Sequence, residues 1–195
     1  MNEDLLREIK STLPWLVAAA LAVGGFYAVK NYRASRKAQA SEAFVSAYTA
    51  EELEEAVSKF GGSDAGGALK LRLAKKYYDT GRFQEAMDLY SSFGASGGPV
   101  GFADVPAVGM AQCREALGDF AAAAADFEAF ADANPSSYLA LAARLGAARC
   151  AAQAGDSAKA LAKLKEIAQS VKGDSLAEAR VKAVEDCVKR FVPRK

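Results

Sequence analysis

Histidine is absent from this chain of 195 residues. Catalytic pairs that use an imidazole as general base are therefore excluded, and so are the usual zinc sites with histidine ligands. The sequence also lacks a glycine-rich phosphate loop, because "GGSDAGG" at residues 61–67 is not followed by the Lys-Ser/Thr pair that such a loop requires. No nucleophile motif is present. We therefore expect no enzymatic activity, no cofactor, no metal ion and no small-molecule substrate.

An excess of charge of one sign is lacking as well. The chain carries 25 basic and 24 acidic residues, which gives a formal net charge of +1. A nucleic-acid binder normally carries a basic excess, so we expect no nucleic-acid partner. Alternating Val, Ile and Thr patterns that would predict strands are also missing, whereas alanine is abundant. The sequence therefore predicts an all-α protein.

One long uncharged segment stands apart from the rest. Residues 11–29, "STLPWLVAAALAVGGFYAV", contain no charge and lie between Lys10 and Lys30. As a helix this segment extends roughly 28 Å, close to the ~30 Å thickness of a bilayer's hydrocarbon core. Trp15 and Tyr27 lie near its two ends, where such rings favour the membrane interface. We predict a transmembrane helix over residues 11–30, in contact with the lipid bilayer. A cleaved signal peptide fits less well because bulky, basic residues follow, and a buried core helix would usually show a polar stripe.

The remaining chain is organised by a repeat of 37 residues. Gly81, Gly118 and Gly155 are spaced at this interval. Small and large apolar residues recur at fixed offsets: Ala86, Ala123 and Ala160 five residues after each glycine, and Tyr90, Phe127 and Leu164 nine residues after it. Glycine permits a turn between antiparallel helices, alanine lets the helices approach closely, and the larger residue fills the groove. The pattern resembles a tetratricopeptide repeat, which implies a solenoid of paired helices and a protein-interaction function.

Cysteines repeat with the same period, at Cys113, Cys150 and Cys187. Equivalent residues of stacked helix pairs lie too far apart for a disulfide, which needs Cα atoms within about 7 Å. We interpret these cysteines as small buried hydrophobic residues; a reactive or metal-binding role is the alternative.

Cys187 also indicates a fourth, incomplete unit. It follows an apparent capping box at Ser175 and Glu178. Leu176, Ala179, Ala183 and Cys187 are predicted to form its apolar face. Such a terminal helix would present its outer face to water, as the ends of solenoids require.

The predicted organisation is as follows: an N-terminal tail (1–10), a transmembrane helix (11–30), a helical stalk with the first soluble helices (31–60), a flexible linker (61–67), three repeats (68–173), and a terminal capping helix with its tail (174–195). Within the stalk region, Thr49 and Glu52 form a second capping box. The short helix that it opens has Leu53, Val57 and Phe60 on one face.

This layout of one span, a helical stalk and about three repeats resembles a bacterial family of ancillary SecYEG translocon subunits, whose soluble part shares a repeat domain with a cell-division coordinator. The resemblance covers nearly the whole chain. It implies a single-pass protein of the bacterial inner membrane with a periplasmic repeat domain, which associates with translocon subunits and with periplasmic chaperones or their clients. Lys30, Arg33, Arg36 and Lys37 follow the span, and by the positive-inside rule they would favour a cytoplasmic repeat domain instead. A structural scaffold for an envelope or cell-division complex is the alternative function.

The partner is expected to bind in the concave groove that the first helices of such repeats form. The repeat positions assign to it Lys75, Tyr78 and Asp79 in the first unit, Gln112 and Glu115 in the second, and Arg149 and Gln153 in the third. A mixed polar surface with one aromatic ring suits an extended peptide or a partner helix. The Lys/Asn arrangement that clamps a C-terminal carboxylate is missing, so capture of a chaperone tail is not predicted.

Overall fold

The computed structural model describes residues 3–62, 66–94, 98–99 and 101–191, with side chains from residue 13 onward. Every regular element in these ranges is a helix, which confirms the all-α prediction. The helices are α1 (Glu3–Ser46), α2 (Ala50–Phe60), α3 (Gly66–Asp79), α4 (Phe83–Ser91), α5 (Val105–Ala116), α6 (Phe120–Ala133), α7 (Ala140–Gln153), α8 (Ser157–Ser170) and α9 (Ser175–Lys189).

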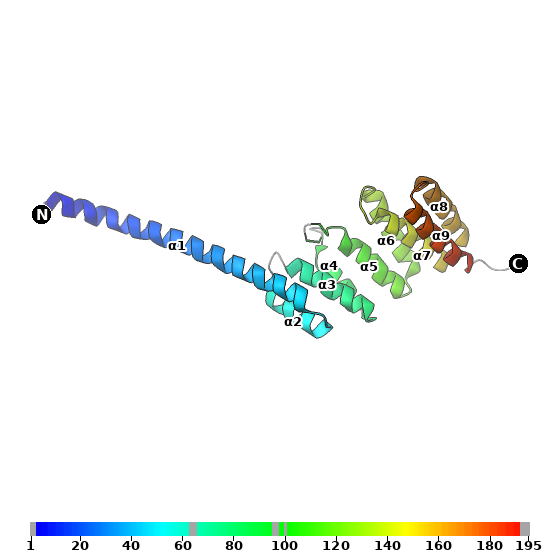
Figure 1. Cartoon of the computed structure of the whole chain (residues 1–195), viewed down its shortest axis with the longest axis horizontal. Coiled ribbons are helices and arrows are strands. Elements are labelled where there is room, and N and C mark those ends of the chain that lie inside the picture. The colour runs from blue at the N-terminus through cyan, green and yellow to red at the C-terminus, as the bar shows by residue number, and fades with distance from the viewer. Residues whose placement is uncertain (1–2, 63–65, 95–97, 100, 192–195) are drawn as a thin grey trace.

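The most prominent element is α1, a single helix of 44 residues that extends away from the other helices (Figure 1). Its segment from Leu13 onward is long and apolar enough to cross a membrane, and none of its most apolar window is buried in the protein. The helix continues without a break from the predicted span into the predicted stalk. It begins at Glu3, so the described part of the predicted N-terminal tail is helical.

The other helices stack as antiparallel pairs at the far end of α1 (Figure 1). Three pairs, α3–α4, α5–α6 and α7–α8, turn at the glycines that the repeat predicts. Gly81, Gly118 and Gly155 have φ values of 81°, 86° and 100°, in the left-handed region that strongly favours glycine. At the second turn, Asp119 N donates to Arg114 O at 3.0 Å, and this hydrogen bond closes the end of α5.

The repeat positions form the core. Ala86, Ala123 and Ala160 are completely buried, and Tyr90, Phe127 and Leu164 are at most 4% exposed. The first helix of the next pair packs closely on two of these large side chains. A Cβ atom at Gly109 would lie 2.6 Å from the Tyr90 ring, and one at Gly146 would lie 2.9 Å from the Phe127 ring. Glycine is therefore needed where these helices cross.

An additional helix pair, formed by α2 and the end of α1, precedes the three predicted units. Leu53 of α2 lies 37 residues before Tyr90 and is only 1% exposed, so α2 occupies the position of a second helix. Ala40 of α1 and Ala47, which directly follows this helix, are buried in the same core cluster. The sequence predicted a helical stalk with the first soluble helices over residues 31–60, and no repeat unit; Phe44, not glycine, stands 37 residues before the turn glycine Gly81. The Thr49–Glu52 capping box at the start of α2 is confirmed.

Two boundary details differ from the prediction. α3 begins at Gly66, so the last two residues of the predicted linker (61–67) are helical, and residues 63–65 lie outside the described ranges. At α9, the capping residue is Asp174 instead of Ser175: its carboxylate accepts hydrogen bonds from Leu176 N and Ala177 N. Glu178 accepts from Gly173 N at 2.9 Å.

The buried face of α9 was also predicted wrongly. Ala177, Val181 and Val188 are buried. Leu176, by contrast, is 72% exposed, and Ala179 and Ala183 are exposed as well. The prediction assumed that α9 keeps the orientation of α5 and α7, but the helix is rotated so that its β-branched residues meet α7 and α8.

Candidate interaction groove

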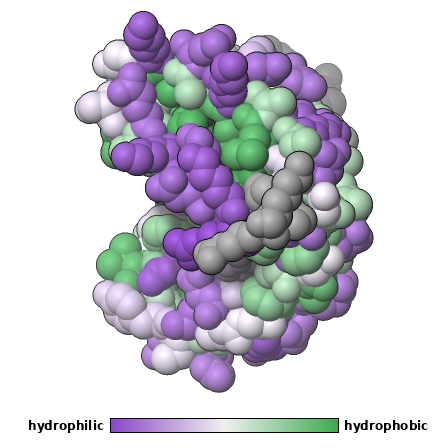
Figure 2. Space-filling view, turned by 90° about the vertical axis from the view of Figure 1, so that its right-hand side faces the viewer, coloured by the Kyte–Doolittle hydropathy of each residue, from purple (hydrophilic) through white to green (hydrophobic). Residues whose placement is uncertain are grey.

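The seven predicted partner-binding residues all lie on the first helices of the three units. Lys75, Tyr78 and Asp79 are on α3, Gln112 and Glu115 on α5, and Arg149 and Gln153 on α7. Seen from its C-terminal end, the molecule has a C-shaped outline that is hollowed on one side and bordered there mostly by hydrophilic surface (Figure 2).

Arg149 and Glu115 form a bidentate polar contact between two units. Arg149 Nε donates to Glu115 Oε1 at 2.5 Å, and Arg149 Nη2 donates to Glu115 Oε2 at 2.6 Å. The side chain of Glu115 is only 14% exposed and that of Arg149 33%. These hydrogen bonds to the carboxylate raise the pKa of Arg149 and keep it charged. The bidentate pair therefore joins α5 to α7 and leaves a partly buried charge centre on the first helices.

Tyr78 lies within the electrostatic field of this pair. Burial is the main cause that raises the pKa of its phenol, and the negative charge of Glu115 raises it further, whereas Arg149 acts in the opposite direction. Its ring packs edge-on against Phe83, with ring centroids 5.4 Å apart. Tyr78 of the first unit and the Glu115–Arg149 pair of the next two units are close enough to interact electrostatically, and we call these three residues the groove centre.

Lys75 and Asp79 flank Tyr78 on the same helix. Their side chains form an ion pair, and Lys75 Nζ lies 5.8 Å from the centroid of the Tyr78 ring. Both side chains are at least half exposed. They therefore extend the groove centre toward solvent without holding helices together.

The two glutamines differ in their surroundings. Gln112 is exposed on α5. Gln153 is half-buried on α7, and its amide oxygen is buried without a hydrogen-bond partner among the described residues. An unpaired buried acceptor costs free energy that a donor supplied from outside the chain could recover. The sequence analysis did not name Phe83, the first residue of α4, whose ring supports Tyr78; its position two residues after the turn glycine Gly81 was the available signal.

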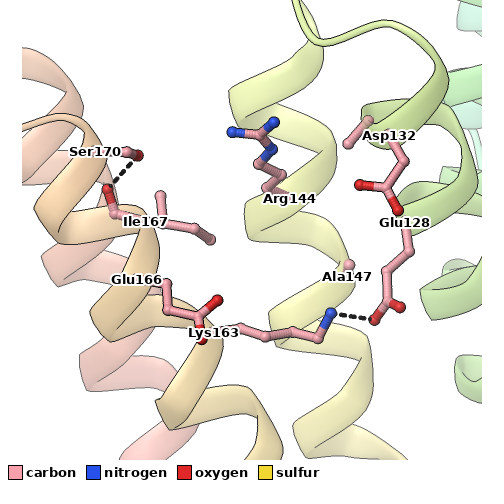
Figure 3. A pocket seen from close by; sticks show the side chains of 9 residues that line it. Glu128, Asp132, Arg144, Ala147, Lys163, Glu166, Ile167 and Ser170 are labelled. Atoms are coloured by element: carbon pink, nitrogen blue, oxygen red, sulfur yellow. Dashed lines mark hydrogen bonds and ion pairs between the residues drawn. The ribbon is translucent and has the colours of Figure 1, made fainter.

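A separate pocket of about 350 Å³ lies between α6, α7 and α8 (Figure 3). Lys163 of α8 reaches across it to Glu128 of α6, with Nζ and Oε1 2.8 Å apart. Arg144 of α7 and Asp132 of α6 point into the same space. None of the seven predicted residues lines this pocket, and it is built largely from second helices.

The cysteines match the expected buried type in two units of three. Cys113 and Cys150 are completely buried. Burial raises the pKa of the Cys113 thiol to about 11 and that of Cys150 to about 12, so both stay protonated near neutral pH. Cys187 is half-buried, and all three are free thiols. Among the residues that the structure describes, no group of three or more potential metal ligands is found.

Comparison with known proteins identifies the repeat region. A family model described as tetratricopeptide repeat matches residues 109–175, which extend from α5 past the end of α8. No curated protein and no solved structure matches the chain. The matched segment contains Gly118, Gly155 and the buried alanines that the 37-residue period places after them. Such repeats typically form non-catalytic scaffolds. The chain therefore contains tetratricopeptide repeats, matched over residues 109–175, and such repeats indicate a protein–protein interaction module.

Proposed function

We propose that this protein is a membrane-anchored adaptor that holds a protein partner in the groove of its repeat domain. One observation carries the proposal: the exposed apolar segment and the first helix of the solenoid's first pair belong to one uninterrupted helix, α1. An anchor of this kind keeps the groove near the membrane. The resulting effective concentration compensates for weak individual contacts with a membrane partner.

The proposed ligand is an extended peptide or a partner helix that lies across α3, α5 and α7. The groove centre offers an aromatic ring, a carboxylate and a guanidinium within one patch, and this combination suits mixed polar and apolar ligands. Gln153 adds a buried acceptor that a backbone N–H of the ligand could satisfy after a small local adjustment.

We further propose that the partners belong to the protein-translocation machinery of a bacterial inner membrane, or are periplasmic chaperones and their clients. The support is the layout of one span, a helical stalk and three repeats, which resembles the ancillary translocon family. A scaffold for an envelope or cell-division complex is the competing function.

Site-specific photocrosslinking tests the groove. A photoreactive residue at Gln112, which is exposed on α5, should crosslink translocon or chaperone subunits in living cells. The matched control is Lys165, exposed on α8 outside the groove centre, which should give no such product. Equal crosslinking at both positions would contradict binding of the partner in the groove. Crosslinks mainly to cell-division proteins would favour the scaffold function over the translocon adaptor.

Topology is tested by fusing alkaline phosphatase to the C-terminus, with a cytoplasm-active reporter in parallel. Phosphatase activity in intact cells is expected, because the proposal places the repeats in the periplasm. If only the cytoplasmic reporter is active, the basic residues after the span decide the orientation and the translocon adaptor is refuted.

A further inference from the structure

Basic residues concentrate just beyond the apolar part of α1. Lys30, Arg33, Arg36 and Lys37 follow Val29 closely, and the next acidic residue along the chain is Glu42. The helix α2 has a similar polarity: its first half carries four glutamates, whereas its end carries Lys59. From Lys30 onward α1 therefore runs from basic to acidic, and α2 runs from acidic to basic.

The pairing of the two helices brings the basic stretch of α1 and the basic end of α2 together. α2 runs back along α1, so that its last residues lie beside Arg36. Arg36 Nη2 donates to Lys59 O at 2.5 Å, and the Arg36 guanidinium lies 4.9 Å from the centroid of the Phe60 ring. Lys59, 23 residues after Arg36 in sequence, thus returns to the same level of α1.

A further lysine joins this region from α3. Lys70 lies beside the end of α2: a Cβ atom at Gly61 would be 3.3 Å from Lys70 Cε. Among the described residues, Lys30, Arg33, Lys37 and Lys70 have no ion-pair partner. Lys59 alone pairs with an acid, Glu55, at 2.5 Å. The region is therefore strongly positive although the whole chain is nearly neutral.

The level of this region along α1 matches the surface of a bilayer. Arg36 is seven residues beyond Val29, which corresponds to about 10 Å along the helix. The headgroup layer occupies roughly 5–8 Å on each side of the hydrocarbon core. Long basic side chains extend toward the interface, and charges interact over a Debye length of about 8 Å. Because α1 is a single helix, this separation is fixed by the fold.

We infer that Lys30, Arg33, Lys37, Lys59 and Lys70 form a basic collar that binds anionic phospholipid headgroups and holds the α2 end of the solenoid against the membrane surface. The inference rests on the proposed membrane anchoring. A basic flank that only directs insertion acts within about 15–20 residues of a span, so such a role accounts for Lys30 to Lys37 but not for Lys59 or Lys70. Only the folded packing of α2 and α3 beside α1 brings these distant lysines to the headgroups.

Hydrogen exchange of the full chain in lipid nanodiscs tests the collar. One set of discs contains only phosphatidylcholine, and in the other about a third of the lipid is phosphatidylglycerol. The amides at the end of α2 and in Gly61–Gly62 should exchange at least about threefold more slowly in the anionic discs at about 50 mM salt. This protection should disappear at about 500 mM salt, where charges are screened.

The decisive variant is Lys37→Gln, Lys59→Gln and Lys70→Gln combined. In this variant the amides should exchange at the same rate in the neutral and the anionic discs, while the chain still inserts into both. The matched control, Lys165→Gln, Lys172→Gln and Lys182→Gln, changes the same charge at exposed sites on and between α8 and α9 and should keep the difference. The collar would be overturned if the parent chain inserts but its amides exchange equally in both discs. It would also be overturned if the control variant loses the protection in anionic discs as fully as the collar variant does. A chain that fails to enter either disc would instead overturn the membrane anchoring itself.

Discussion

The middle and the end of the solenoid use the same repeat position differently. Gly109, Gly146 and Ala183 are each 37 residues apart. The first two lie against the aromatic rings of Tyr90 and Phe127, whereas Ala183 is exposed. The helices α5 and α7 are held between neighbours on both sides, while α9 packs mainly on α7 and α8. A middle helix is therefore positioned by close steric contact, and the terminal helix by an apolar stripe alone.

The largest expected effect comes from adding a side chain at the close contact. Gly146→Leu should destabilise the protein by about 2–3 kcal/mol and lower Tm by several degrees, because the new side chain overlaps the Phe127 ring. The matched variant Ala183→Leu should change the stability by less than about 0.5 kcal/mol, since that position faces solvent. Thermal unfolding followed by circular dichroism measures both. An equal loss of stability in the two variants would mean that α9 is packed as closely against its neighbours as α7.

A smaller effect should follow from breaking the ion pair that joins two middle units. Glu115→Gln leaves the Arg149 guanidinium partly buried without its carboxylate and should cost about 1–2 kcal/mol. The matched variant in α9 is Glu185→Gln, which breaks a more exposed pair with Lys189. It should leave the denaturation midpoint unchanged, because exposed pairs contribute little. An unchanged denaturation midpoint for Glu115→Gln would show that the Glu115–Arg149 pair does not stabilise the packing of α5 against α7.

These contrasts show what the sequence could predict. The period of 37 residues predicted the turn glycines and the buried alanines correctly, because both are local requirements of a helix pair. It did not predict the rotation of α9 or the role of α2, because these depend on which neighbours are available to cover a face. The seven groove residues were placed on the correct helices, but their positions could not show that Glu115 and Arg149 bind each other. Whether the groove binds a partner stays a prediction.

A still smaller and more local loss of stability is expected at the N-terminal cap of α9. Asp174→Ala removes the carboxylate that accepts from Leu176 N and Ala177 N and should cost about 1 kcal/mol. Ser175→Ala should have almost no effect, because Ser175 is the first helical residue and its side chain caps nothing. Chemical denaturation of both variants measures the difference. A larger loss for Ser175→Ala would restore the capping box that the sequence predicted.

The mildest test leaves the residues unchanged and compares the repeated cysteines. A maleimide should label Cys187 of α9 first, since Cys113 and Cys150 are buried and react only when the solenoid opens. Mass spectrometry of the labelled native protein is expected to show one modified thiol of the three. Fast labelling of all three would show that the middle units are as loosely held as the end.

The same two buried thiols predict how stability depends on pH. Their pKa values are raised by burial to about 11 for Cys113 and about 12 for Cys150, from an ordinary value of 9.0. Above pH 9 the unfolded chain therefore loses these protons while the folded chain keeps them. Their stabilising contribution is complete below pH 9 and is lost as pH rises toward 11 and 12. Tm measured across this interval should fall less steeply in Cys150→Ala than in the parent chain. Equal slopes in the two proteins would contradict the burial of Cys150 between the middle helices.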